Sequence, residues 1–420
     1  MVLFIQEGWT YYVSVQTAAL FFLAGVLLHA GLAARFTPMV LAVYALFFVL
    51  LVGTSVAMPD TISQNSPNIV VTTIGVLGYV ALILAMTSLH PVRAEWLLRF
   101  YRRSAAAIVG VIVTLVAVTD LGVIPGLTRE YFIYQNVRLI TNWAMIDVLM
   151  ADFSARNARG VPPDIDLFYG EQSFLSLVLF VSLVSHVISS RALHRLRSAD
   201  TGPSGERDIW GVSIPLLFYG VACMVYIQSF SSLFYALILL GFVSANVLQR
   251  AEAIKLTTAK VAILFLLLVA MSWVAIEASH YYWHRLITFS DSLSAQQRFG
   301  ILFDFLPQDF LLGLHERGRM PPLGFHNGLI YVVMMGGIGG VCLLAYLMYH
   351  VTRLAHPLGL ATLSMLAVLA VFSQNGAIFS PNKLVILSFV LVPLMSWGPV
   401  DMIFRLGSRN AVRPDSPIFS

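Results

Sequence analysis

Eight arginines lie in two long segments, residues 126–170 and 280–326, and could bind phosphate. A guanidinium group keeps its charge and forms two parallel hydrogen bonds to a phosphate group. Several arginines in neighbouring loops therefore suit a diphosphate, although any single one could be a simple solvated loop charge. The eight are Arg129, Arg138, Arg156, Arg159, Arg285, Arg298, Arg317 and Arg319.

A histidine at the end of the second segment could move a proton. His326 and Asn327 stand directly before a long apolar run. A neutral imidazole can accept a proton from a hydroxyl group, because the unperturbed pKa of histidine lies near neutrality. His326 is therefore a candidate general base, and the alternative is an interfacial histidine without a chemical role.

The apolar run after His326 carries four glycines within five residues, of which Gly336 and Gly340 form a GxxxG pair. Such a pair lets two membrane helices approach closely. We expect Gly336, Gly339 and Gly340 to pack against another helix and not to touch a substrate. They would hold in place the helix that follows His326.

Other patterns exclude several kinds of site. The triplet Asp164–Asp166 (DID) resembles the metal-binding Asp-x-Asp of nucleotide-sugar transferases, but it occurs easily by chance, and we reject it. No HExxH, GxSxG or P-loop pattern is present. The two cysteines, Cys223 and Cys342, lie in apolar runs and suggest no metal site. We therefore expect neither a metal nor a cofactor.

The composition indicates that these residues are positioned by membrane-spanning elements. The chain is 58% hydrophobic and only 11% charged, so it belongs to the integral membrane class. The first apolar run is longer than a signal-peptide core, and we expect a retained span there. The isoelectric point near 9.1 indicates basic cytoplasmic loops and not nucleic-acid binding. We expect one integral membrane domain over residues 1–420, with no nucleic-acid partner.

The expected fold is an all-α polytopic membrane protein, since a span needs about 20 mostly apolar residues. About eleven runs satisfy this requirement, and the two long segments connect them. The runs are residues 11–32, 38–57, 68–88, 105–125, 171–190, 209–228, 231–248, 261–279, 327–348, 357–373 and 384–400.

Lysine and arginine determine the expected orientation. Sixteen of the 25 Lys and Arg residues fall on one side of the expected spans, which is therefore cytoplasmic. Both long loops then face outward, as does the N-terminus, and both loops contain stretches suited to amphipathic helices at the membrane surface. We expect ionisable residues almost entirely in loops, apart from Asp120 and Glu277 near outer span ends.

The order of these features resembles the order found in the O-antigen ligase and polysaccharide polymerase superfamily. In that family a large outward loop is followed by a histidine, nine residues and Gly-x-x-Gly, as in His326 followed by Gly336 and Gly339. A Ser-x-x-x-Arg segment precedes the histidine in the family, and Ser294 to Arg298 (SAQQR) is similar. The serine-rich sequence QSFSSLF at 228–234 is similar to a serine-rich turn at which an earlier span begins in the same family.

A further motif resembles exopolysaccharide-type polymerases, in which an arginine–glycine pair precedes a Glu-x-Ser motif that opens a span. Arg159–Gly160 and the sequence GEQSF, which contains Glu171, are similar to it. Gln172 stands where proline is usual, and Gly340 stands where the ligases often have Thr or Tyr. The resemblance covers about residues 150–345.

The resemblance implies a GT-C-like, metal-independent glycosyltransferase of the bacterial inner membrane, with its active site on the periplasmic side. The donor would be a polyprenyl-diphosphate-linked oligosaccharide, and the product an exopolysaccharide or O-antigen. It implies catalytic roles for His326, Arg298 and Glu171. It also implies diphosphate binding by Arg159, Arg298, Arg317 and Arg319. Membrane lipids, a flippase, a chain-length regulator and export proteins are the implied partners.

Two alternatives to a polymerase remain. A ligase would transfer the glycan to a lipid or another acceptor, and the motif at Glu171 favours polymerase over ligase. A flippase or transporter of the same lipid-linked glycan would belong to a different class, and it should carry charges inside several spans. The expected confinement of charges to loops favours the enzyme.

The orientation predicts which positions are accessible from outside the cell membrane. Cysteines introduced at Ala155 and Ala295 should react with a membrane-impermeant maleimide in intact spheroplasts, because both lie in outward loops. A cysteine at Ser198 should stay unlabelled until the membrane is permeabilised. Labelling at position 198 with none at the other two positions would show that the predicted orientation is reversed.

Overall fold

The structure is a computed structural model that describes most of the apolar segments of the chain. It covers residues 3–6, 9–12, 23–29, 32–34, 37–57, 69–91, 93–120, 172–201, 214–227, 230–251, 307–313, 327–373 and 381–411, with single residues at 266, 269, 272 and 276. The first expected outer loop, residues 126–170, lies outside the described residues. In the second, 280–326, only residues 307–313 are described, so the amphipathic helices predicted there stay predictions.

Helices make up most of the described chain. They are α2 (Pro38–Ala57), α4 (Ile69–Thr87), α5 (Ala94–Asp120), α8 (Gln172–Thr201), α9 (Ile214–Ile227), α10 (Phe230–Ala251), α13 (Pro307–Leu312), α14 (Gly328–Ala355), η4 (His356–Leu358), α15 (Ala361–Ser373) and α16 (Pro381–Ala411). Four short strands form two antiparallel pairs: β1 (Leu3–Gln6) with β2 (Trp9–Tyr12), and β3 (Leu32–Ala34) with β4 (Leu89–Pro91).

By length and composition alone, two of the described helices could cross a membrane, although the second is interrupted at Gly337. They cover Leu175–Leu196, with 22 residues, and Gly328–Leu358, with 31 residues. Six shorter apolar helices accompany them. The helix α2 is apolar on all sides. Its apolar side chains therefore include both buried ones, such as Phe47, and exposed ones, such as Val49, which is 62% exposed. A helical membrane protein fits this pattern, and the count of eleven spans stays a prediction.

The first expected span, residues 11–32, is wrong as a continuous helix. Tyr11 and Tyr12 belong to β2, and Leu32 belongs to β3, so the described helical part is only residues 23–29. Aromatic residues fit a paired strand well, and here Tyr11 and Tyr12 pair with Phe4 and Leu3. Hydropathy alone does not distinguish such a pairing from a span.

Four other spans extend beyond their expected ends. The helices α14 and α16 continue to Ala355 and Ala411, past the expected ends at 348 and 400. The helix α5 begins at Ala94, eleven residues before the expected start at 105, and α8 continues to Thr201, beyond the expected end at 190. The arginines in the first turns of α5 do not end the helix, because this part is amphipathic. Leu97, Leu98 and Tyr101 are buried on one face, while the opposite face carries exposed charges.

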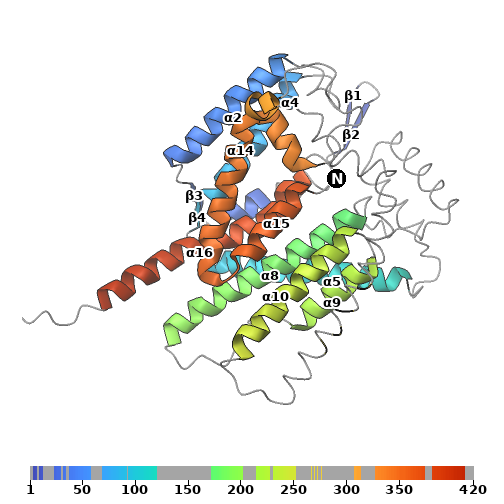
Figure 1. The fold of residues 1–420 in the computed structure, drawn as a ribbon, viewed down its shortest axis with the longest axis vertical. Helices are drawn as coiled ribbons and strands as arrows, with labels where there is room; N and C mark the ends of the chain where they lie inside the picture. The colour runs from blue at the N-terminus through green and yellow to red at the C-terminus, as the bar shows by residue number, and fades with distance from the viewer. Residues whose placement is uncertain are drawn as a thin grey trace, which may run out of the picture.

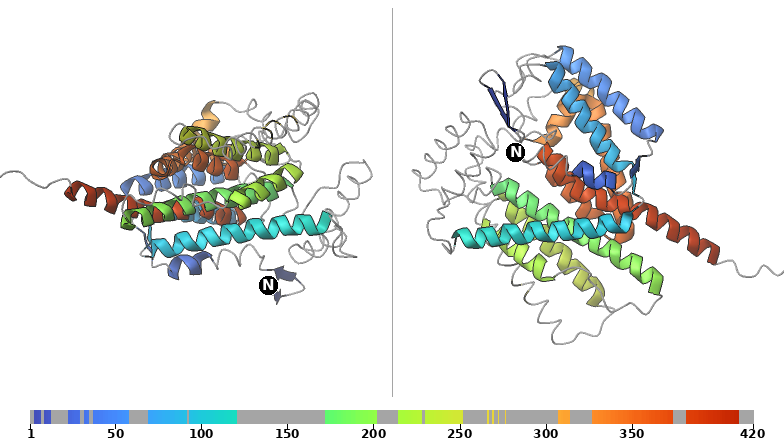
Figure 2. Two further views of the ribbon diagram at one scale, coloured as in Figure 1. Left: turned by 90° about the horizontal axis from the view of Figure 1, so that it is seen from below. Right: turned by 180° about the vertical axis from the view of Figure 1, so that it is seen from behind.

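The helix α8 lies at the centre of the bundle. It packs against α5, α16, α10, α9 and α15 and is buried along most of its length. Figure 1 shows α15 and α16 between the group α2, α4 and α14 and the group α5, α8, α9 and α10. Figure 2 shows these helices in stacked layers, with the C-terminal part of α16 projecting beyond the bundle.

Polar contacts join the ends of the helices. The guanidinium group of Arg191 in α8 donates from Nη1 to the carbonyl oxygens of Leu358 (3.0 Å) and Gly359 (3.4 Å), in the turn between α14 and α15. The same guanidinium group lies 5.1 Å from the ring centre of Phe242 in α10. Gly359 has a φ of 66°, which favours glycine at this turn. Arg191 therefore links α8 and α10 to the α14–α15 connection.

Candidate functional site

All of the predicted catalytic and diphosphate-binding residues lie outside the described residues. These are His326, Arg298, Glu171, Arg159, Arg317 and Arg319, and their roles stay predictions. The structure does describe the helix that begins directly after His326, together with Gly336, Gly339 and Gly340. The candidate site is therefore built from α14 and its neighbours.

The chain is held in place at the residue next to His326. Asn327 caps α14, because its Oδ1 accepts a hydrogen bond from the backbone N–H of Leu329 at 2.9 Å. Its backbone carbonyl accepts from the N–H of Tyr331 at 3.0 Å. Such a cap satisfies a backbone donor that the first helical turn leaves free, and removing one typically costs about 1 kcal/mol. The first turn of α14 thus has a defined start one residue after His326.

Two of the glycines lie against α2. A Cβ atom on Gly336 would collide with the ring of Phe47, and one on Gly339 would lie 2.8 Å from the Cα atom of Phe47. Because Phe47 is buried between the two helices, any side chain at these glycines would push α2 and α14 apart. Gly336 and Gly339 thus allow the close packing of α14 on α2.

The expected continuous span 327–348 is interrupted at Gly337, which has φ 50° and ψ −135° inside α14. A Cβ atom on Gly340 would lie 2.8 Å from the carbonyl carbon of Val332, eight residues earlier. In an unbroken helix those residues would be about 12 Å apart along the axis. The segment before Gly337 therefore folds back against the segment after it, and Gly340 packs on its own helix.

The short helix α13 fits against this interruption. A Cβ atom on Gly337 would collide with the carbonyl oxygen of Leu311 and would lie 2.8 Å from the backbone nitrogen of Gly313. Gly313 also has a positive φ, of 85°. Part of the segment that sequence analysis treated as an outer loop thus packs onto the middle of an apolar helix.

A polar stripe runs along the buried helix α8. Ser182, Ser185, His186 and Ser189 are spaced at i, i+3, i+4 and i+7 and share one side of the helix. His186 is 6% exposed, and its Nδ1 donates to the carbonyl oxygen of Arg102 in α5 at 3.3 Å. Within the described part of the chain, the hydroxyl groups of Ser185 and Ser189 have no hydrogen-bond partner. An unpaired buried hydroxyl typically costs about 1–3 kcal/mol, so this stripe is unusual in an apolar bundle.

A lysine is buried near the start of α16. Lys383 is 2% exposed, and its Nζ donates to the carbonyl oxygen of Val371 at 3.0 Å. Val371 lies in the last turn of α15, where backbone carbonyls lack helical partners and the helix dipole favours a cation. The expected spans 357–373 and 384–400 leave Lys383 in the short connection between them, so its burial was not expected.

The expectation that ionisable residues stay in loops is therefore wrong at His186 and Lys383. His186 lies inside the expected span 171–190, and its spacing with the serines was a signal available in the sequence. The burial of Lys383 had no comparable signal, since a lysine at a span end is usually exposed. Both residues bear on the choice between an enzyme and a transporter.

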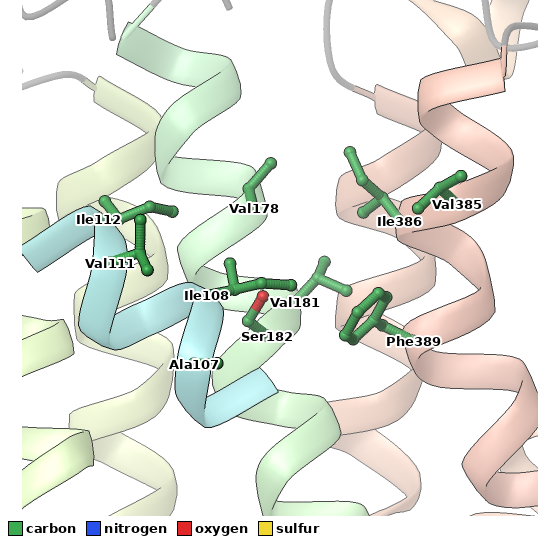
Figure 3. Close-up of a pocket in the computed structure, with 10 residues that line it drawn as sticks. All are labelled: Ala107, Ile108, Val111, Ile112, Val178, Val181, Ser182, Val385, Ile386 and Phe389. Carbon is green, nitrogen blue, oxygen red and sulfur yellow. The ribbon is translucent and has the colours of Figure 1, made fainter. Parts of the chain in front are cut away.

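An apolar cavity of about 360 Å³ lies between α5, α8 and α16. Figure 3 shows side chains from all three helices around it, with the Ser182 hydroxyl as the one labelled polar group. Such walls suit hydrocarbon and not a sugar or phosphate. The lining residues are Ala107, Ile108, Val111, Ile112, Val178, Val181, Ser182, Val385, Ile386 and Phe389.

A metal site is not formed by the residues that the structure describes. No group of three or more His, Cys, Asp or Glu side chains gathers among them. The two buried ionisable side chains described above, His186 and Lys383, lie on different helices, α8 and α16. The candidate site therefore combines the described start of α14 with the predicted loop residues.

The close contact at Gly339 predicts a specific loss of stability. Gly339→Ala should lower the thermal unfolding temperature of the purified protein, because the new methyl group meets the backbone of Phe47. Overpacking of this kind typically costs about 1–3 kcal/mol. Gly241→Ala is the matched control in α10, where a Cβ atom meets nothing within 4 Å, and it should leave the temperature unchanged or raise it. Equal effects of the two substitutions would show that α2 and α14 do not pack as described.

Comparisons with known proteins do not assign this chain to a family: no family model, no curated protein and no solved structure matches it. The functional conclusion therefore rests on the order of the sequence motifs and on the geometry around α14.

Proposed function

We propose that this chain is a polysaccharide polymerase that joins polyprenyl-diphosphate-linked oligosaccharide units at the outer face of a bacterial inner membrane. One observation supports the proposal most directly. The helix that follows His326 starts at a capped residue and is packed through glycines onto α2. A general base needs such fixed surroundings, because catalysis depends on holding the reacting groups within bonding distance.

The proposed reaction forms one glycosidic bond and breaks one bond to phosphate. The hydroxyl oxygen of the acceptor sugar attacks the anomeric carbon of the donor, with inversion at that carbon. The bond between this carbon and the diphosphate oxygen breaks, and the polyprenyl diphosphate leaves with the electron pair. The hydroxyl proton passes to the imidazole of His326.

Arginines supply the second half of the proposed chemistry. Arg298, Arg317 and Arg319 from the second loop and Arg159 from the first would bind the diphosphate as negative charge develops on it. One preorganised donor at such a charge is worth about a hundredfold or more in rate, and a general base adds about a hundredfold or more. These two effects need no metal. Glu171, which directly precedes α8 in the sequence, would help to orient the acceptor.

His326→Ala should abolish polymerisation by the purified protein in nanodiscs supplied with lipid-linked repeat units. The expected loss is at least about a hundredfold in turnover, since a general base acts on the transition state. Expression and donor binding should change little, because the imidazole is not needed to bind the diphosphate. His356→Ala, in the η4 turn at the opposite end of α14, is the matched control and should keep activity. If His326→Ala turns over at the wild-type rate, His326 is not the general base.

A second candidate is a flippase or transporter of the same lipid-linked glycan. Buried ionisable residues at His186 and Lys383 and the interruption of α14 at Gly337 favour it. Ionisable side chains inside spans mark transport routes in many membrane proteins, and interrupted helices often form their binding sites. The polymerase remains the first proposal, because the transporter does not account for the motifs around His326 and Arg298.

Lipid-linked intermediates in a strain lacking the gene should distinguish these functions. A polymerase defect should leave single repeat units on the outer face of the membrane, because units are still flipped but not joined. A ligase defect should leave long lipid-linked polymer, and a flippase defect should trap single units on the cytoplasmic face. Either of the last two results would contradict the polymerase.

A further inference from the structure

A cluster of basic and aromatic side chains lies where α5 begins. We call it the α5-start cluster, and it consists of His29, Arg93, Trp96, Arg99 and Phe100. We infer that the α5-start cluster binds the headgroup of an anionic phospholipid. The inference rests on insertion of the helices into a membrane and is independent of the proposed glycosyltransferase activity.

Direct contacts hold the cluster together. The guanidinium Nη1 of Arg93 lies 3.2 Å from Nε2 of His29, and since arginine can only donate, the imidazole nitrogen accepts. The His29 ring meets Trp96 edge-on, with ring centres 4.9 Å apart. Trp96 in turn stacks on Phe100 at 5.6 Å. Four side chains thus form one connected surface.

The fold builds this surface from two distant parts of the chain. His29 ends the helical residues 23–29, whereas the other members belong to α5 or directly precede it. The pairing of β3 with β4, with Ala33 opposite His90, brings the two segments together. Figure 2 shows the short blue helix beside the N-terminal end of α5. The cluster is therefore a feature of the folded protein and not only of a basic sequence.

The segment that carries most of this cluster has a net positive charge. Between residues 93 and 103 there are four arginines and one acidic residue, Glu95. Arg99 pairs with Glu95, but both side chains are about half exposed, so this ion pair neutralises only one charge and contributes little to stability. Arg93 and Arg103 are also exposed. Positive charge in the first turns of a helix opposes the helix dipole, so a bound anion would relieve an unfavourable arrangement.

The aromatic members indicate a lipid headgroup and not a free anion. Trp96 is 38% exposed, on a helix that continues into the apolar residues around Val109 and Ile112. Tryptophan and arginine directly beside an apolar helix are typical of the membrane–water interface. Basic residues at this position attract anionic lipids, whereas a soluble phosphate would gain nothing from the exposed indole.

The test titrates detergent-solubilised full-length protein with phosphatidylglycerol and follows the apparent dissociation constant through thermal stabilisation. Phosphatidylcholine and inorganic phosphate serve as separate probes. We expect stabilisation by phosphatidylglycerol and none by the other two. Arg93→Gln should weaken the binding about fivefold, the usual contribution of one arginine near an anionic surface. Arg93→Lys should retain most of the binding, since it keeps the charge.

Arg353→Gln is the matched control. Arg353 is an exposed arginine on α14, and its substitution removes the same charge from a residue that is not a member of the cluster. Trp96→Ala should weaken phosphatidylglycerol binding, while Arg353→Gln should not. Equal weakening by Arg353→Gln would show diffuse attraction to positive charge and would overturn the site. If inorganic phosphate stabilises the protein as strongly as phosphatidylglycerol does, the ligand of the cluster is not specifically a lipid.

Discussion

Inside this bundle of apolar helices, a buried polar group without a partner is costly, and the polar contacts at the helix ends follow from that cost. A helix leaves several backbone groups unpaired at each end, and hydrocarbon offers them no hydrogen bonds. Asn327 supplies a partner at the start of α14, and Arg191 supplies one at the turn where that helix ends. Lys383 does the same for the last turn of α15. Arg191 and Lys383 thus connect α8 to the turn between α14 and α15, and α16 to the end of α15.

Steric fit determines how the middle of the bundle packs. The glycines of α14 allow Phe47 and the backbone of α2 to approach, and Gly337 lets the helix fold back while α13 packs against it. These contacts make the start of α14 part of a packed unit. A catalytic residue next to Asn327 would therefore sit at the edge of a rigid element, which is where binding and catalytic groups are commonly carried.

The two proposals concern different parts of the molecule. The transferase would work at the N-terminal end of α14, whereas the α5-start cluster lies where α5 begins, beside the β3–β4 pair. The polar stripe of α8 runs through the region between α5 and α16, at the centre of the bundle. A membrane enzyme with a lipid-linked substrate needs both a site for chemistry and a fixed depth in the bilayer. Arginine and tryptophan at the interface are suited to setting that depth.

The sequence by itself predicted a membrane protein. It determined the helical character of the chain and the approximate positions of α2, α4, α9, α10 and α15, because hydropathy depends only on consecutive residues. It also predicted the glycine-rich helix after His326. The chemistry proposed for His326 and the loop arginines likewise comes from sequence and lies outside the described residues. Only the tertiary structure decided the strands at Tyr11 and Leu32, the interruption at Gly337, the burial of Lys383 and the contact between His29 and Trp96. Each of these depends on a neighbour far along the chain or on a bend that brings neighbours together, and local patterns of hydropathy and spacing do not record such contacts.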